Sequence, residues 1–254
     1  MPIEEAFVAA VAIAWSIFVV FVRVSAAIFS LPGLGEQWLS VRVRLVLALM
    51  LTSAVYPAVA PALSLPNPSF PAFLRALATE TIAGLFLGLM LRLFIIAIQT
   101  AGAIMAQSTS LSQLLANAGV DPLPAIGHVL TIAALALLMA TGFHVKAAAF
   151  LILSYDLLPV MQFPSPASVA DAGRVRVAES FALAFSLAFP FVILAVLYNL
   201  TLGVINKAMP TLMVAFVGAP VITLGSITLL FFTAPVVLAV WIDAVERFLA
   251  APFR

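Results

Sequence analysis

Few side chains of the types used in catalysis or metal binding occur in this sequence. The chain has two histidines, His128 and His144, and no cysteine. Lys146 follows His144 by two positions, which places these two side chains on different faces of a helix. The histidines form no H-E-x-x-H arrangement, and the lack of cysteine excludes thiolate ligands, disulfides and cysteine nucleophiles. We therefore expect no metal site and no cofactor.

Three patterns typical of membrane-associated enzymes are incomplete. Tyr155-Asp156 matches one half of the aspartate pair of an intramembrane aspartyl protease, but no G-x-G-D follows. Gly225-Ser226 lacks the rest of the G-x-S-G pattern of a rhomboid-like serine protease. The G-x-x-x-x-G-K-[ST] loop that cradles ATP phosphates is also absent. We expect a protein that is not an enzyme and that moves a substrate across a membrane, or shapes the path by which it moves.

A polar segment at 106–125 reads AQSTSLSQLLANAGVDPLPA and contains no lysine or arginine. Two interpretations fit it. It is an exposed turn, or it lines or obstructs a water-filled path, because irregular polar backbone persists at membrane depth only where it is buried in protein or faces a cavity. Its candidate residues are Gln107, Ser108, Thr109, Ser110, Gln113, Asn117 and Asp121.

A stripe of four residues, each four positions apart, marks one face of the apolar segment that surrounds it: Glu80, Gly84, Gly88 and Arg92. The two glycines form a G-x-x-x-G step, which lets another helix approach closely. A cation at the centre of a membrane helix costs roughly 2.5 kcal/mol or more, so Arg92 faces protein or water, or extends to the membrane surface from near the end of its segment. Glu80 lies about 18 Å from Arg92 along a helix. Each of these two charges, if buried, needs a partner from another element.

The elements that must position these residues are long apolar helices. Of 254 residues, 65% are hydrophobic and 8% charged, whereas about a quarter of the residues of a soluble domain are charged. A membrane-spanning helix needs about 20 apolar residues, and no alternation of period two suggests a barrel. We predict an all-α polytopic membrane protein with six apolar segments. They are Ala6–Val22, Leu45–Ala62, Thr81–Ile98, Val129–Leu153, Phe181–Leu202 and Leu212–Ile242.

The ends of the chain and its balance of charge exclude two further classes. Glu4 and Glu5 stand where a signal peptide carries lysine or arginine, so we expect the first segment to be retained. The net charge of +1 does not favour nucleic-acid binding.

Prolines, glycines and polar residues predict where the helices end. Five prolines, at positions 57, 61, 66, 68 and 71, predict that the second helix ends there and continues as an extended connector. Ser168 and Asp171 have the spacing of a capping box that starts a short polar helix. We also expect a kink or break at Pro190, and others in the last apolar run, which contains Gly218, Pro220, Gly225 and Pro235.

Asn206, Lys207 and Pro210 separate the last two apolar runs. The simplest interpretation of this stretch, NKAMPTLMVAFVGAP, is the bend of a two-helix hairpin.

Several motifs, in order along nearly the whole chain, resemble the FliR family of flagellar type III export-gate proteins. The quoted matches are RVSAAIFSLPGLGEQWLSVRVRLVLAL, ETIAGLFLGLMLRLFIIAIQTAGAIMAQ, TGFH, SYDLLP and GVINKAMPTLMVAFVGAPVITLGSITLL, with Asp121-Pro122 between the second and third. The chain departs from the family at two places. Ser108-Thr109-Ser110-Leu111 stands where relatives often carry Met-Gly-Leu, and Gly142-Phe143-His144 where they carry Gly-His-His.

The resemblance implies an inner-membrane subunit of the flagellar basal body that takes part in protein export. It implies a single domain, 1–254, in which a FliP-like portion (1–178) precedes a FliQ-like hairpin (179–254). The implied partners are FliP-like and FliQ-like gate subunits, FlhB-like and FlhA-like export proteins, and unfolded proteins in transit. The segment near 106–125 corresponds to the loop that helps plug the closed channel. Glu80, Gly84, Gly88, Arg92, Asn206, Lys207 and Pro210 are then candidates for subunit contacts or the pore.

Two alternatives remain at this point. A virulence-type secretion gate subunit shares the same physics but exports effectors. A secondary transporter for a small solute would place Arg92 and Glu80 at a site near the membrane midplane, and it would show an inverted repeat with paired broken helices.

Overall fold

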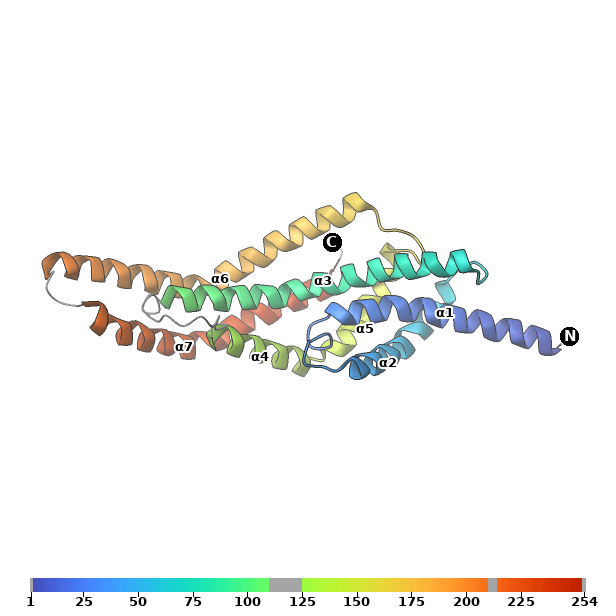
Figure 1. Cartoon of the computed structure of the whole chain (residues 1–254), viewed down its shortest axis with the longest axis horizontal. Coiled ribbons are helices and arrows are strands. Elements are labelled where there is room, and N and C mark those ends of the chain that lie inside the picture. The colour runs from blue at the N-terminus through green and yellow to red at the C-terminus, as the bar shows by residue number, and fades with distance from the viewer. Residues whose placement is uncertain (1, 110–124, 210–213, 253–254) are drawn as a thin grey trace. The chain divides into compact units, whose positions relative to one another are not determined.

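A computed structural model describes residues 2–109, 125–209 and 214–252, and these residues form helices without any strand. The helices and their order are drawn in Figure 1. They are α1 (Pro2–Ser30), α2 (Val41–Val59), the short 3₁₀ helix η1 (Ala60–Ala62), α3 (Phe70–Thr109), α4 (Ala125–Ala140), α5 (Phe143–Leu157), α6 (Pro166–Ala208) and α7 (Val214–Ala250). The predicted all-α class is confirmed.

Six apolar stretches in the described part of the chain have the length and composition of membrane spans. Five are single helices, and the sixth is α4 and α5 taken together, which are bent by 74° at the break between them. The break falls at Gly142, whose φ of 75° lies in the left-handed region that glycine adopts without steric cost. The predicted segment at 129–153 is therefore a broken span.

The predicted start of the helix near Ser168 is wrong. α6 starts at Pro166, and Ser165 accepts a hydrogen bond from the Ser168 amide (3.4 Å), so Ser165 caps the helix in place of Ser168. Serine before a helix-starting proline is a favourable N-terminus because proline lacks the amide that would otherwise need a partner. Asp171 instead pairs with Arg174 on the exposed surface (2.8 Å).

The described helices do not break at proline or glycine, and the alternative expectation of a kink at these residues stays a prediction. α6 continues through Pro190 for 43 residues, and α7 runs unbroken for 37 residues. A single proline removes one backbone hydrogen bond, and a long apolar helix can lose one without ending. The connector prediction is partly confirmed: α2 contains Pro57 and ends at Val59, η1 follows, and residues 63–69 have no helix.

The chain forms two compact units, each described here by itself. The first comprises 1–93, 138–176 and 247–254. Within it α2 packs against both α1 and α5. A cluster of buried apolar side chains joins α1, α3 and the segment after α5: Trp15, Val19, Ala72, Ala76 and Met161.

The second unit comprises 94–137 and 177–246. Trp241 of α7 is fully buried, and its Nε1 donates a hydrogen bond to the carbonyl of Phe94 in α3 (2.7 Å). Gly102 of α3 lies against Gly127 of α4 so closely that a Cβ added to Gly102 would overlap the Gly127 Cα. The first contact fixes α7 against α3, and the second fixes α4 against α3.

Candidate functional site

A buried ion pair joins α1 to α3. Arg23 Nε donates to Glu80 Oε2 at 2.6 Å, and the two side chains are 1% and 0% exposed. A lone buried charge of either sign would be strongly unfavourable, so each residue satisfies the other. The prediction that a buried Glu80 needs a partner from another element is confirmed.

The Arg23 guanidinium extends this contact to α5. Its Nη1 donates to Ser154 Oγ (3.3 Å), and its Nη2 donates to the Leu158 carbonyl at the end of α5 (2.9 Å). The guanidinium carbon also lies 3.9 Å from the centre of the Tyr155 ring, a cation–π distance. One arginine therefore holds three elements together.

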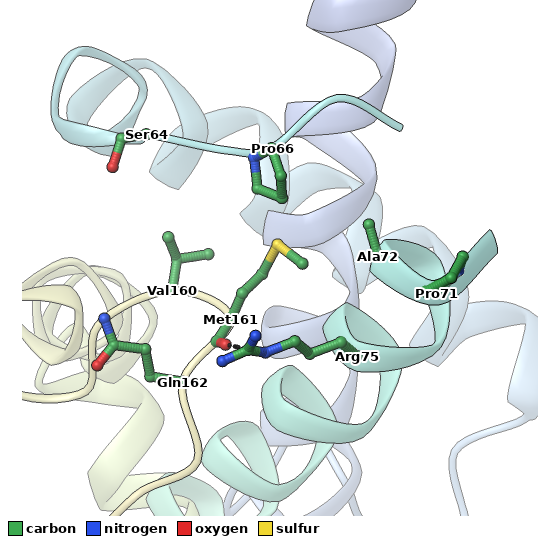
Figure 2. A pocket seen from close by; sticks show the side chains of 8 residues that line it. All are labelled: Ser64, Pro66, Pro71, Ala72, Arg75, Val160, Met161 and Gln162. Carbon is green, nitrogen blue, oxygen red and sulfur yellow. Dashed lines mark hydrogen bonds between the residues drawn. The ribbon is translucent and has the colours of Figure 1, made fainter. Parts of the chain in front are cut away.

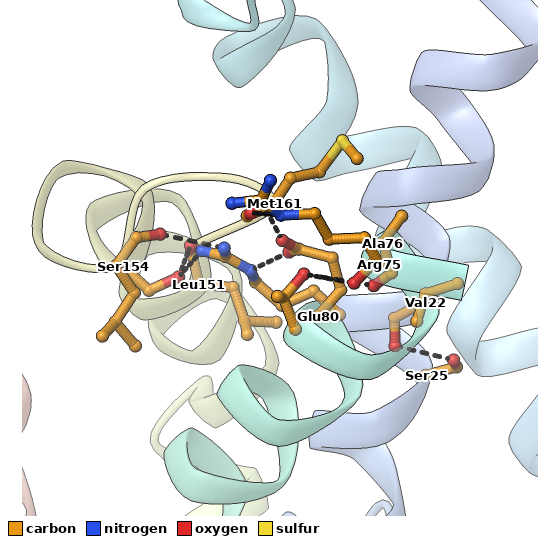
Figure 3. Close-up of polar contacts among 11 residues, drawn as sticks. Val22, Ser25, Arg75, Ala76, Glu80, Leu151, Ser154 and Met161 are labelled. Atoms are coloured by element: carbon orange, nitrogen blue, oxygen red, sulfur yellow. Dashed lines mark hydrogen bonds and ion pairs between the residues drawn. The ribbon is translucent and has the colours of Figure 1, made fainter. Parts of the chain in front are cut away.

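Glu80 and Arg75 also clamp the peptide of Met161 (Figure 3). The Met161 amide donates to Glu80 Oε1 (2.7 Å), and Arg75 Nε donates to the Met161 carbonyl (3.0 Å). Met161 is the only non-glycine residue of the described chain with a positive φ, at 57°. Such a conformation in a bulky residue persists only where its surroundings hold it, and here two side chains of α3 do so.

A second ion pair, beyond the C-terminal end of α1, fixes the loop that follows this helix. Arg92 Nη1 donates to Glu36 Oε1 at 2.5 Å, with side chains 27% and 10% exposed. The same carboxylate oxygen accepts from the Gly33 amide (3.4 Å). Arg92 thus faces protein, and the requirement for a partner from another element is confirmed for it too.

The G-x-x-x-G step brings α3 close to α1, as its spacing predicts. A Cβ on Gly84 would lie under 3.0 Å from the Arg23 carbonyl oxygen and the Ala26 Cβ. A Cβ on Gly88 would lie equally close to Ser30 Oγ and the Ala27 carbonyl oxygen. Both glycines are buried against a helix of the same chain. Like the two ion pairs, they hold the first unit together.

The candidate plug residues lie at and beyond the end of α3. Gln107 is exposed, and Ser108 Oγ donates back to the carbonyls of Ile104 and Met105 (2.7 and 2.9 Å). Thr109 is the last residue of α3. Ser110, Gln113, Asn117 and Asp121 lie outside the described residues.

The candidate hairpin bend is described as far as Met209. Asn206 and Lys207 are exposed on the last turn of α6, where a cation complements the negative end of the helix dipole. Pro210 lies outside the described residues.

The residues tested for catalysis and metal binding do not assemble into a reactive group. Ser226 Oγ donates to the Ile222 carbonyl of its own helix, and Asp156 is exposed. In the described parts of the chain, no three histidine or acidic side chains lie close enough to hold a metal ion.

Sequence analysis alone did not identify Arg23 and Glu36 as the partners of the two stripe charges. Arg23 was identifiable in principle, because it directly follows an apolar run and a buried arginine requires an acid. Glu36 lies in a loop, where an exposed side chain is the normal expectation.

Comparisons with known proteins agree with the motif pattern. The family model described as "Bacterial export proteins, family 1" matches residues 14–248. The flagellar biosynthetic protein FliR of Caulobacter vibrioides is 32% identical over 236 residues, which is 91% of this chain and 92% of that protein. FliR of Escherichia coli is 29% identical over 220 residues (85% and 82%), and FliR of Aquifex aeolicus is 28% identical over 216 residues (83% and 82%). The chain therefore belongs to family 1 of the bacterial export proteins, to which it is matched over nearly its whole length.

Proposed function

We propose that the chain is an inner-membrane subunit of the flagellar protein export apparatus, which helps form and close the channel through which unfolded flagellar proteins leave the cell. Family membership and the long apolar helices support the apparatus and the membrane. The relatives described above all carry flagellar names, which supports the flagellar branch over a virulence-type gate. We propose no catalytic role, and the energy for export would come from partner proteins.

The observation that carries the channel-closing role is the contact between α3 and α4 at the base of the polar segment. Gly102 and Gly127 place the two helices in backbone contact, one on each side of residues 106–125. A side chain at Gly102 would force the helices apart, because its Cβ would overlap the Gly127 Cα. The segment between these two helices is rich in hydroxyl and amide groups. Such a segment is suited to obstruct a polar path without binding tightly to the protein that passes.

Subunit contacts are proposed at the exposed end of α6. Asn206 and Lys207 are available there, whereas Glu80, Gly84 and Gly88 are used within the chain. The division into a FliP-like portion (1–178) and a FliQ-like hairpin (179–254) is part of this proposal. The partners would be FliP-like and FliQ-like subunits, with FlhB-like and FlhA-like proteins alongside.

The small-solute transporter has less support from the geometry. It requires Glu80 and Arg92 to share one site, and they instead form separate ion pairs with Arg23 and Glu36.

Deletion of residues 108–117 tests the channel-closing role. We expect the gate to assemble, because the contacts described within each unit lie elsewhere in the chain. We also expect it to conduct ions when no export substrate is present. The measurement is ion conductance of the purified gate in a planar bilayer, with subunit composition checked by mass spectrometry. A variant with residues 108–117 replaced by glycine and serine at equal length separates the effect of length from that of sequence. Unchanged conductance of the fully assembled deletion variant would count against the proposal.

A further inference from the structure

An open cavity of about 400 Å³ lies in the first unit, between the connector after η1, the start of α3 and the segment after α5 (Figure 2). Arg75 extends into it from α3, with Ser64 and Pro66 on one side and Met161 and Gln162 on the other. None of the roles proposed above uses this cavity.

The floor of the cavity is rigidly built. Met161 is only 6% exposed and belongs to the same apolar cluster as Trp15 and Ala72. Its left-handed backbone is held at both ends, by Glu80 at the amide and by Arg75 at the carbonyl. The hydrogen bond from Arg75 Nε to the Met161 carbonyl also fixes the Arg75 guanidinium at the cavity. It uses only Nε, so both Nη groups remain available to a ligand.

The polar side chains that line the cavity are exposed and can donate hydrogen bonds to a ligand. In the described chain Arg75 makes its only side-chain hydrogen bond through Nε, and the side chains of Ser64 and Gln162 make none. No acidic residue lines the cavity. Glu80, which lies behind the floor, is already paired with Arg23. Arg75 is exposed at the cavity, so its two Nη groups are accessible to an anion with several acceptor oxygens, the geometry that a guanidinium fork recognises in phosphates and carboxylates.

The surroundings of the cavity fit a ligand with an apolar body. Phe70, Leu74 and Phe163, on the elements that form the cavity, are 74%, 49% and 60% exposed. The connector at 63–69 and the segment at 158–165 have no helix, and exposed irregular backbone does not lie in hydrocarbon. Exposed apolar side chains next to such backbone offer a surface for the acyl chains of a ligand whose polar group lies in the cavity.

A neighbouring cavity of about 290 Å³ shares Pro66 and is lined by Trp15. Trp15 is 9% exposed, and its indole Nε1 has no hydrogen-bond partner in the described chain. This end of the unit thus has a buried, unmatched donor. The ester carbonyl of a lipid is an acceptor that would pair with the Trp15 indole N–H.

We propose that the Arg75 cavity binds the phosphate of an anionic phospholipid, with Arg75 as the main ligand and Ser64 and Gln162 as additional donors. The acyl chains lie along the exposed apolar side chains of α3 and of the segment after α5. This function is independent of the export role, and its failure would leave that role untouched.

The test is binding of dihexanoyl phosphatidylglycerol to the full-length chain purified in a nonionic detergent, followed by native mass spectrometry. We expect saturable binding of one lipid, weaker binding of dihexanoyl phosphatidylcholine, and little binding of inorganic phosphate. Arg75→Gln should weaken the phosphatidylglycerol affinity by about tenfold or more, the effect of losing a charged hydrogen bond. Arg174→Gln is the matched control, because Arg174 is an exposed arginine paired with Asp171, and it should leave the affinity unchanged.

If Arg75→Gln fails to fold, a Ser64→Ala/Gln162→Ala double variant tests the cavity instead. Neither of these side chains makes the hydrogen bonds that hold the Met161 backbone. It should weaken binding about threefold or more. The proposal is overturned if the foldable cavity variants bind phosphatidylglycerol like the wild type. It is also overturned if inorganic phosphate binds as tightly as the lipid, or if neither lipid binds and a gate subunit crosslinks to Gln162 instead.

Discussion

Removing the Glu80 carboxylate should destabilise the protein strongly. Arg23 is 1% exposed, and in Glu80→Ala it loses the one anionic partner that it has in the described chain, while the Met161 amide loses its acceptor. Breaking a buried ion pair by removing one partner costs about 3–5 kcal/mol. We expect the free energy of unfolding to fall by that amount.

Two further variants separate charge from hydrogen bonding. Glu80→Gln keeps an oxygen for the Met161 amide but leaves Arg23 without a counter-charge, so its loss of stability should approach that of Glu80→Ala. Replacing both Arg23 and Glu80 by methionine removes the pair together, and similar replacements of buried pairs by apolar residues are often neutral or stabilising. The double variant should therefore be more stable than Glu80→Ala.

The assay is equilibrium unfolding in mixed detergent micelles, followed by the fluorescence of Trp15, Trp38 and Trp241. Asp171→Asn, in the pair whose side chains are 74% and 69% exposed, is the control and should change stability by less than about 0.5 kcal/mol. If Glu80→Ala unfolds like the wild type, the pair does not hold the unit together. The same conclusion follows if the double methionine variant is no more stable than the less stable of Glu80→Ala and Glu80→Gln.

Two other predictions concern packing. Gly84→Ala should lower the unfolding free energy because its Cβ meets the α1 backbone, whereas Gly173→Ala, a helical glycine with nothing within 4 Å, should raise it by up to about 1 kcal/mol through helix propensity; equal effects in the same unfolding assay would refute the close approach. Trp241→Phe should lower the free energy of unfolding by about 0.5–1.5 kcal/mol because it removes the hydrogen bond from Nε1 to the Phe94 carbonyl, whereas Trp38→Phe, at a side chain that is 74% exposed, should have little effect. Thermal unfolding of both variants is the measurement, and equal midpoints would exclude the bond as a stabilising contact.

The apolar segments and the chemistry of the stripe were predictable from the sequence. Long runs of apolar residues have few structural alternatives in a membrane, which is why all six segments appear in the described chain. The need of Glu80 and Arg92 for partners follows from the cost of burying a charge. Their identities do not, because Arg23 and Glu36 lie 57 and 56 residues away along the chain and only the packing of the helices brings them near.

The predictions based on local breakers were less successful. Pro190 lies in the interior of α6 without ending it, because the packing and apolar surroundings of a long helix outweigh one lost backbone bond. Gly142 breaks the fourth segment instead, through a left-handed conformation that sequence alone does not distinguish from an ordinary helical glycine. The clamp on Met161 was also beyond sequence reasoning, since it depends on two α3 side chains that bind the backbone N–H and C=O of one residue.

The central claim is that this chain works as a gate subunit for flagellar export. The most direct measurement is mass spectrometry of the complex extracted with the tagged full-length chain from its native host in mild detergent. We expect FliP-like and FliQ-like subunits to co-purify in fixed proportion, and a strain without the chain to lack flagellar filaments. The gate role would be contradicted if the chain were recovered as a stable monomer that transports a small solute by itself, from cells whose filaments do not depend on it.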